Sequence, residues 1–182
     1  AAASSKPVIA ANGGDTNITL QIDGKGSGGV AIKGSTLGDA ATAGYVAEVF
    51  TSAILPGSGT SLSTNTPANV TSITLTPGDW DIWGSVSFEG GATTAFTYGL
   101  GAIATSSINV NNNTGPTFFN FTYFPTAPTI FATFSSSQAP TISVAGGRLN
   151  FTANTTVYLT AQAGFTVSTC GAFGGIFARR RR

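Results

Sequence analysis

The chain has 182 residues, of which 41% are hydrophobic and only 8% are charged, and its formal net charge is +1. Thirteen Phe, four Tyr and two Trp exclude the composition of a disordered chain, which combines high charge with few aromatic residues. The sequence contains no His and one Cys, Cys170, so it offers no ligand set for zinc, haem or an iron–sulfur cluster and no histidine base for a catalytic thiol. We therefore expect no metal, no cofactor, no enzymatic activity and a buried, inert Cys170.

The charge is also unevenly spread, because no residue between Gly90 and Gly147 is charged. A monomer so poor in charge would be poorly soluble, whereas buried interfaces are depleted of charge. The distribution therefore favours an obligate assembly of several copies. No apolar run approaches eighteen residues, so no membrane span is expected.

The first 44 residues are predicted to form an arm followed by short β-rungs. Residues 1–17 are mostly small and give little to bury, so we expect them to become ordered on a partner. Beyond them, apolar residues alternate with polar ones on either side of a glycine-rich turn at residues 24–29. With three copies around an axis, this apolar face would form part of a trimer interface: Ile18, Leu20, Ile22, Val30 and Ile32. The turn matches G-x-G-x-x-G, but a strand-like run follows it rather than a helix, so we expect no nucleotide site.

Residues 45–182 are predicted to form the main domain, an all-β antiparallel sandwich of the jelly-roll or TNF-like type. Short runs with period-two alternation recur with turn residues between them and without a helical period. The expected strands are 45–54, 69–76, 80–88, 94–104, 117–124, 129–134, 141–144, 148–151, 156–165 and 171–179. Turns are expected at Pro56-Gly57, Pro77-Gly78, Gly90-Gly91, residues 111–113 and Gly146-Gly147.

Residues 70–88, VTSITLTPGDWDIWGSVSF, are interpreted as a hairpin that opens this domain. Its second strand carries a clear apolar face, and a later strand carries another. The predicted core is Trp80, Ile82, Val86, Phe88, Val157, Leu159 and Phe165. Trp83 falls on the opposite, polar face and is too large to leave in water, so we expect a second chain or a second sheet to cover it, and we assign it to the trimer interface.

The charged residues allow several interpretations. Asp79 and Asp81 lie two apart on one strand and point to one face, but nothing nearby would keep one of them protonated for catalysis, and no calcium-loop pattern surrounds them. The run Arg179, Arg180, Arg181, Arg182 could bind nucleic acid, which no second basic cluster supports, or could simply keep a strand end from pairing. A third hypothesis is that these arginines pair with Asp79, Asp81 or Glu89.

Several segments resemble bacteriophage virion proteins of the short-fibre, head-fibre and tail-fibre-like kind. Residues 71–88 resemble their L-T-x-G-D-W-D-V-x-G-x-V-x-F signature. Residues 44–48, GYVAE, resemble their G-Y-V-G-E with Ala47 in place of the usual glycine, and residues 26–30, GSGGV, resemble their G-x-G-x-V rung. Residues 161–180 resemble their final strands and basic terminus. The motifs come in the same order and cover most of the chain from Ile18 onward.

The resemblance implies a homotrimer with a β-sandwich as its C-terminal domain and a place on the surface of a virion. It suggests a capsid decoration (cement) or head-fibre protein, attached to the major capsid protein or another virion protein through its N-terminal arm. The alternative is a tail-fibre module that recognises glycans on the host surface. The signature carries no catalytic role that could be transferred to this chain.

Overall fold

The computed structural model describes residues 9–10, 12–14, 16, 18–22, 41–108, 110, 118–125, 140–166 and 168–182. The chain divides into two units, Ala1–Asp39 and Ala40–Arg182. The boundary lies five residues before the predicted one, because residues 42–45 are bonded to the segment that follows: the Tyr45 amide donates to the Thr42 carbonyl, and the Gly44 amide donates to the Glu48 carboxylate.

In the first unit, the expected strand around Ile18, Leu20 and Ile22 is not formed. Residues 18–22 have no regular secondary structure, and these three side chains are 42–59% exposed. Val30 and Ile32 lie outside the described residues. The prediction of a trimeric rung region therefore depends on contacts that a single chain does not make.

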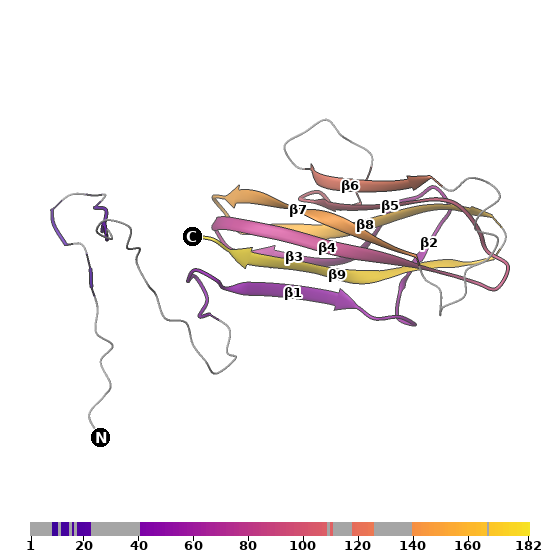
Figure 1. Cartoon of the computed structure of the whole chain (residues 1–182), viewed down its shortest axis with the longest axis horizontal. Helices are drawn as coiled ribbons and strands as arrows, with labels where there is room; N and C mark the ends of the chain where they lie inside the picture. The colour runs from indigo at the N-terminus through magenta and orange to yellow at the C-terminus, as the bar shows by residue number, and fades with distance from the viewer. Residues whose placement is uncertain are drawn as a thin grey trace, which may run out of the picture. The chain divides into compact units, whose positions relative to one another are not determined.

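The second unit is a sandwich of two antiparallel sheets (Figure 1). One sheet, called sheet A here, has the order β1-β9-β4-β7, and the short β2 also pairs with β9; sheet B has the order β3-β8-β5-β6. The strands are β1 Val49–Ile54, β2 Thr60–Leu62, β3 Ala68–Leu75, β4 Gly78–Gly90, β5 Ala95–Ala104, β6 Phe118–Pro125, β7 Thr141–Phe151, β8 Thr155–Thr166 and β9 Cys170–Arg180. The predicted all-β antiparallel sandwich is thus confirmed.

The strand pairing is nested along the sequence. β1 pairs with β9, β3 with β8, β4 with β7 and β5 with β6, so the first half of the domain pairs with the second half taken in reverse. The remaining pairings, β4 with β9 and β5 with β8, complete the two sheets. The first and last strands of the domain are therefore neighbours, although more than a hundred residues separate them.

The predicted hairpin at residues 70–88 is wrong in its pairing. β3 and β4 are joined by only Thr76 and Pro77, but β3 belongs to sheet B and β4 to sheet A. The corner at Pro77 carries the chain from one sheet to the other, so that the apolar faces of both strands are buried in the core between the two sheets. Val70, Ile73 and Leu75 of β3 all lie in the core, and a bulge between Asn69 and Thr71 shifts the alternation.

The core between the sheets contains nearly all of the residues predicted for it. Trp80, Ile82, Val86, Phe88, Val157 and Leu159 are fully buried, and Phe165 is partly buried against them. Full burial of one such side chain stabilises the fold by about 1.5–3 kcal/mol. Gly84 shares the inward parity of β4, and a Cβ there would lie only 3.3 Å from Leu159 of the opposite sheet.

The observed strands differ from the predicted ones at Gly146-Gly147 and at β2. The expected turn at Gly146-Gly147 is instead a bulge inside one strand, β7, where the pairing with β4 shifts between Ile82 and Gly84. The short β2 was not predicted, because its three residues give no detectable alternation. The expected strand at residues 129–134 lies outside the described residues.

Candidate functional site

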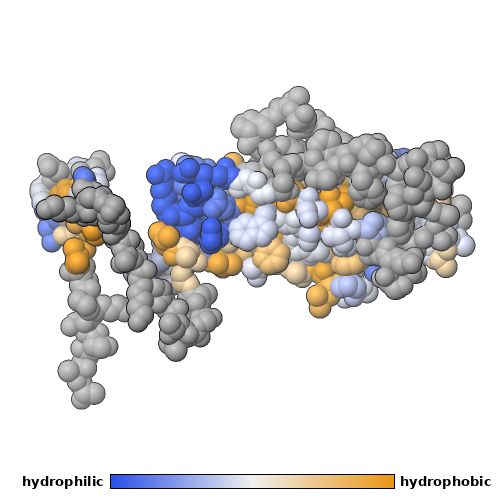
Figure 2. All heavy atoms as spheres, viewed as in Figure 1, coloured by the Kyte–Doolittle hydropathy of each residue, from blue (hydrophilic) through white to orange (hydrophobic). Residues whose placement is uncertain are grey.

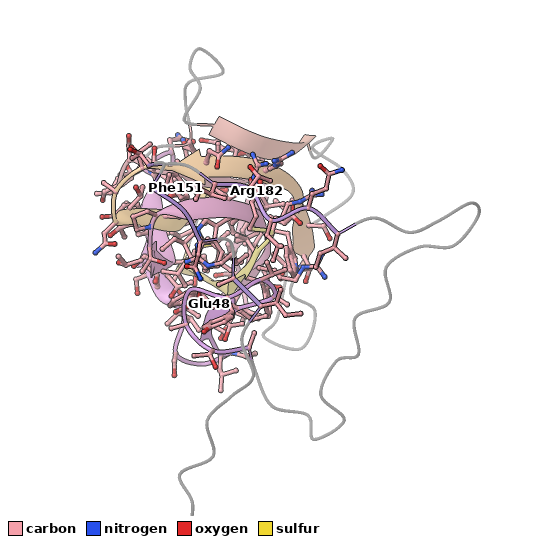
Figure 3. The ribbon with its side chains drawn as sticks, turned by 90° about the vertical axis from the view of Figure 1, so that its left-hand side faces the viewer. Glu48, Phe151 and Arg182 are labelled. Atoms are coloured by element: carbon pink, nitrogen blue, oxygen red, sulfur yellow. The ribbon has the colours of Figure 1, made fainter. Side chains whose placement is uncertain are left out.

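One end of the sandwich collects nearly all of its charge. The five arginines of residues 40–182 are Arg148 of β7 and the run at 179–182, and three of the four carboxylates, Glu48, Asp79 and Asp81, lie among them. We call these eight residues the arginine end. Figure 3 shows Glu48, Phe151 and Arg182 together at this end, and Figure 2 shows it as a strongly hydrophilic region.

At the centre of the arginine end is a buried ion pair between Glu48 and Arg180. Arg180 Nε donates to Glu48 Oε2 at 2.8 Å, and both side chains are only about 5–6% exposed. The Gly44 amide also donates to Glu48 Oε2, at 2.9 Å. The other nitrogens of Arg180 donate to the Pro77 carbonyl at 2.8 Å and to the Thr76 hydroxyl. Because each of the three guanidinium nitrogens has a hydrogen-bond partner, the pair meets the condition under which a buried ion pair can be tolerated.

Trp80 and Gly78 of the T-P-G-D-W motif shape the site of this arginine. The Arg180 guanidinium lies 4.3 Å from the centre of the Trp80 ring, in a cation–π contact. Gly78 has φ +148°, and a Cβ at that position would clash with the Arg180 guanidinium. The Trp80 indole N–H donates to the Thr76 carbonyl at 3.0 Å, which fixes the ring. The motif therefore builds the pocket in which Arg180 lies.

Main-chain bonds close the same corner. The Ala47 amide donates to the Arg180 carbonyl at 3.0 Å, and the Arg180 amide donates to the Glu48 carbonyl at 2.9 Å. The Arg181 amide donates to the Asp79 carbonyl at 2.7 Å. Ala47 has φ +72°, a left-handed conformation that suits glycine. We call this set of bonds around Glu48 and Arg180 the corner clasp.

The outer part of the arginine end is a network of exposed arginines around two aspartates. Asp79, 2% exposed, accepts from Arg148 Nε at 2.8 Å and from Arg148 Nη2 at 2.5 Å, and Arg182 Nε lies 3.2 Å away. Asp81, 26% exposed, pairs with Arg181 at 3.2 Å and with Arg179 at 3.7 Å. The hypothesis that the arginine run pairs with Asp79 and Asp81 is confirmed.

Within the described part of the chain, Glu89 takes no part in the ion pairs of the arginine run. It lies at the far end of β4, where its carboxylate accepts from the Gly57 amide at 3.4 Å. Arg179 pairs with Asp81 because the two residues are directly opposite in the β4–β9 register. Asp79 lies inside sheet A, because β4 is flanked by β7 and β9.

The contacts of Glu48 and Asp79 favour the charged form of these two carboxyl groups. The hydrogen bonds from Arg148 outweigh burial and lower the pKa of Asp79. Burial alone would raise the pKa of Glu48, but the bonds from Arg180 and the Gly44 amide hold that pKa below its ordinary value. A general acid needs the opposite, a pKa raised toward the working pH. The arrangement therefore stabilises structure and charge rather than proton transfer.

An aromatic pair lies on the outer face of sheet A next to the arginine end. The Trp83 and Phe177 rings are stacked, with centroids 6.0 Å apart and an interplanar angle of 10°. They remain 40% and 37% exposed. Trp83 thus lies on the outer face as predicted, and its proposed coverage by a second chain stays a prediction.

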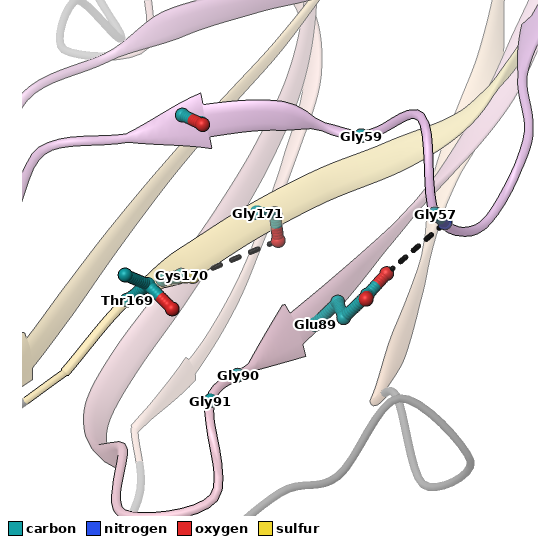
Figure 4. Close-up of a pocket in the computed structure, with 9 residues that line it drawn as sticks. Gly57, Gly59, Glu89, Gly90, Gly91, Thr169, Cys170 and Gly171 are labelled. Atoms are coloured by element: carbon teal, nitrogen blue, oxygen red, sulfur yellow. Dashed lines mark hydrogen bonds between the residues drawn. The ribbon is translucent and has the colours of Figure 1, made fainter.

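The opposite end of the sandwich holds a small hollow of about 240 Å³, shown in Figure 4. Backbone of Gly57, Gly90 and Gly171 forms much of its lining, together with Glu89 and Cys170. Cys170 is buried, and burial raises the pKa of its thiol to about 12, so the thiol stays protonated and unreactive. Among the described residues, no group of three or more His, Cys, Asp or Glu side chains could hold a metal ion.

Sequence reasoning missed two members of the site, Glu48 and Arg148. Glu48 was noticed only as the last letter of the GYVAE motif, and its pairing with Arg180 spans 132 residues. Arg148 is the first charged residue after a long uncharged run, and its register partner on β4 is Asp81, one step from Asp79. An isolated charge in such a sequence is a usable signal that a buried partner of opposite sign exists.

The chain was compared with protein families, curated proteins and solved structures. No protein-family description matches the chain, and no curated protein matches it. Among solved structures, the VP2 subviral particle of infectious bursal disease virus is similar over 74% of this chain, with a TM-score of 0.41 and 11% identity. The match covers 33% of the VP2 chain, so this chain spans about a third of that protein. The described part of the chain contains no helix that is long and apolar enough to cross a membrane.

The corner clasp predicts a large effect of Glu48→Gln on stability. Removing the carboxylate leaves the Arg180 charge buried without compensation, which should lower the free energy of unfolding by roughly 3–5 kcal/mol in urea denaturation. The double variant Glu48→Leu/Arg180→Met should recover much of this loss, because an apolar pair removes both charges. The control Glu89→Gln, at the other end, should change stability by less than about 0.5 kcal/mol. Equal effects of Glu48→Gln and Glu89→Gln would contradict the clasp.

The positive φ of Ala47 predicts that Ala47→Gly stabilises the protein. Relief of the left-handed strain should exceed the entropy that glycine adds to the unfolded chain, giving a gain of about 0.5–1 kcal/mol in the free energy of unfolding. The matched control is Ala53→Gly in β1, where φ is not positive, which should instead destabilise by about 0.5–1 kcal/mol. Destabilisation by both substitutions would show that Ala47 is not strained.

The lowered pKa values of Glu48 and Asp79 predict acid sensitivity. Their contribution to stability is complete above the unfolded-state values of about 4 and is lost as the pH falls through the lower folded-state values. The free energy of unfolding should therefore decline below about pH 4, and Asp79→Asn should flatten that decline. An unchanged slope in Asp79→Asn would exclude this carboxyl as a source of the effect.

Proposed function

We propose that the protein is a structural component of a bacteriophage virion, a homotrimeric capsid decoration or head-fibre protein attached by its N-terminal arm. The observation that carries the proposal is the corner clasp. Three segments carry the resemblance to phage proteins and are distant in sequence: GYVAE, T-P-G-D-W and the final arginines. Their residues contact one another in the corner clasp. The positive φ of Ala47 also supports the proposal, because the phage signature that the segment resembles has glycine at this position, and glycine adopts such a backbone conformation without strain.

The strand topology supports a jelly-roll or TNF-like type of sandwich. The nested pairing is that of a long antiparallel ribbon rolled on itself, with β1-β9-β4-β7 facing β3-β8-β5-β6. Jelly rolls are used in viral capsid and lectin domains, where they act through their surfaces. A role that depends on surfaces also suits a chain in which Glu48 and Asp79 are engaged in ion pairs that stabilise the fold.

Two features support the homotrimer. The sequence from Gly90 to Gly147 contains no charged residue, and the Trp83–Phe177 pair is exposed on the outer face of sheet A; both properties suit burial against other copies. In the N-terminal unit, Ile9, Ile18, Leu20 and Ile22 are 42–80% exposed, so a single chain leaves its apolar face uncovered. The arm is the part proposed to attach to the major capsid protein or another virion protein.

A tail-fibre module that recognises host-surface glycans is the second candidate. The Trp83–Phe177 pair favours it, because exposed aromatic rings offer a large, rigid apolar area to a ligand. The two candidates differ in copy number, since a decoration protein is spread over the capsid and a tail-tip module is confined to a few positions.

The proposal predicts the behaviour of a chain that lacks residues 1–17. Light scattering should give the full chain a mass of three times 18.3 kDa, and the shortened chain should remain a trimer of correspondingly lower mass. In a sedimentation assay with purified phage particles stripped of the protein, the full chain should bind and the shortened chain should not. A single-chain mass would contradict the trimer, and full binding by the shortened chain would contradict the anchor.

A further inference from the structure

The charge of the sandwich is confined to one end. Residues 40–182 contain nine charged residues, five arginines and four carboxylates, and eight of them form the arginine end. The ninth, Glu89, is ten residues beyond Asp79 on the same strand, which corresponds to roughly 33 Å. A surface that is otherwise almost uncharged therefore has one strongly ionic region, shown in Figure 2.

This region carries a surplus of positive charge at its surface. Glu48 and Arg180 neutralise each other in the interior. The four remaining arginines are 50–72% exposed and share only two carboxylates, Asp79 and Asp81. Two of the four guanidinium charges therefore have no carboxylate of their own. Together the four guanidinium groups have roughly twenty N–H donors, more than the two aspartates can accept.

A hollow lies among these arginines. It has a volume of about 350 Å³ and is lined by Val46, Ala47, Asp81 and the arginines 179–181. Beside it, Tyr45 and Val46 are 66% and 64% exposed. Val49, 48% exposed, lies opposite Arg179 in the β1–β9 register. Arginine and tyrosine around exposed apolar side chains are the composition of protein–protein contact sites.

The complementary charge is not found in the chain itself. Residues 1–39 contain three lysines and three aspartates, so they carry no acidic surplus. In the sandwich, Glu89 alone lies outside the arginine end. Two arginine ends brought face to face would repel each other. A partner that satisfies this surface therefore has to be a different molecule that carries negative charge.

The compact arrangement of the basic residues and the exposed Tyr45 and Val46 beside them favour an acidic protein surface over a nucleic acid. The basic residues form a compact group around a hollow, not a stripe that could follow a phosphate backbone. All of them are arginines, whose planar fork binds a carboxylate through two parallel hydrogen bonds, as Arg148 already does with Asp79.

We propose that the arginine end is a docking site for an acidic surface of another protein. Carboxylates of the partner bind Arg179 and Arg181 at the rim of the hollow, and its apolar side chains cover Tyr45 and Val46. The proposal does not depend on the trimer or on the N-terminal anchor, because it is argued from side chains of residues 45–182 within a single chain.

The test measures binding of a fluorescent oligoglutamate peptide to the full chain by anisotropy, with a short DNA duplex of similar charge as the second probe. The peptide should bind at about 50 mM salt and more weakly at about 200 mM salt. Arg179→Gln/Arg181→Gln should weaken peptide binding at least tenfold, roughly, because both changes remove rim charges. The control Ser58→Glu/Thr93→Glu lowers the net charge by the same two units at the far end, and should bind the peptide within about twofold of the unmodified chain.

Three results would overturn the proposal: no binding of the peptide by the unmodified chain at the lower salt concentration, equal losses in the two double variants, or tighter binding of the DNA than of the peptide. The last result would assign the site to phosphate groups. Light scattering of both double variants should show an unchanged oligomeric state, so a failure of this proposal is distinguishable from a failure of the trimer.

Discussion

The buried pair of Glu48 and Arg180 is the constraint on which the rest of this sandwich depends. The nested strand pairing brings the first and last strands of the domain together, and a sandwich of this kind must be closed where they meet. Glu48 precedes β1 and Arg180 ends β9, so their ion pair joins the two ends of the pairing pattern. Loop closure over so many residues is costly in entropy, and a strong, geometrically specific contact at the junction offsets part of that cost.

The pair also organises the residues around it. Arg180 occupies the space that Gly78 leaves free and lies over Trp80. Its guanidinium donates to the Pro77 carbonyl at the corner. The corner in turn directs β3 and β4 into opposite sheets, which places Leu75 and Trp80 in one core. Glu48 and Arg180 are buried and paired with each other, so only the outer arginines of this end can contact other molecules.

The sequence predicted the fold class, the two apolar faces and most strand positions, because alternation and turn residues are local signals. Trp80, Ile82, Val86 and Phe88 needed only their parity to be placed in the core. Pairing partners were not predictable in this way, and Pro77-Gly78 looked like a hairpin although it is a corner between sheets. Local sequence cannot distinguish the two, since both need a tight turn between strands.

The site was only partly predictable for the same reason. The pairing of the arginine run with Asp79 and Asp81 could be foreseen because both groups are conspicuous in a chain so poor in charge. Glu48 and Arg148 were missed, because their partners become neighbours only through the nested topology. The left-handed Ala47 was visible as a departure from the phage signature, but its conformation required the structure.

We propose that this protein acts as a trimeric structural part of a phage particle. A cryo-electron microscopy reconstruction of intact particles that contain the protein tests it most directly. If the protein is a trimeric decoration protein, density for the sandwich should appear on the particle surface in groups of three, repeated over the capsid. Absence of the protein from mature particles, or single copies at a position without threefold contacts, would contradict it.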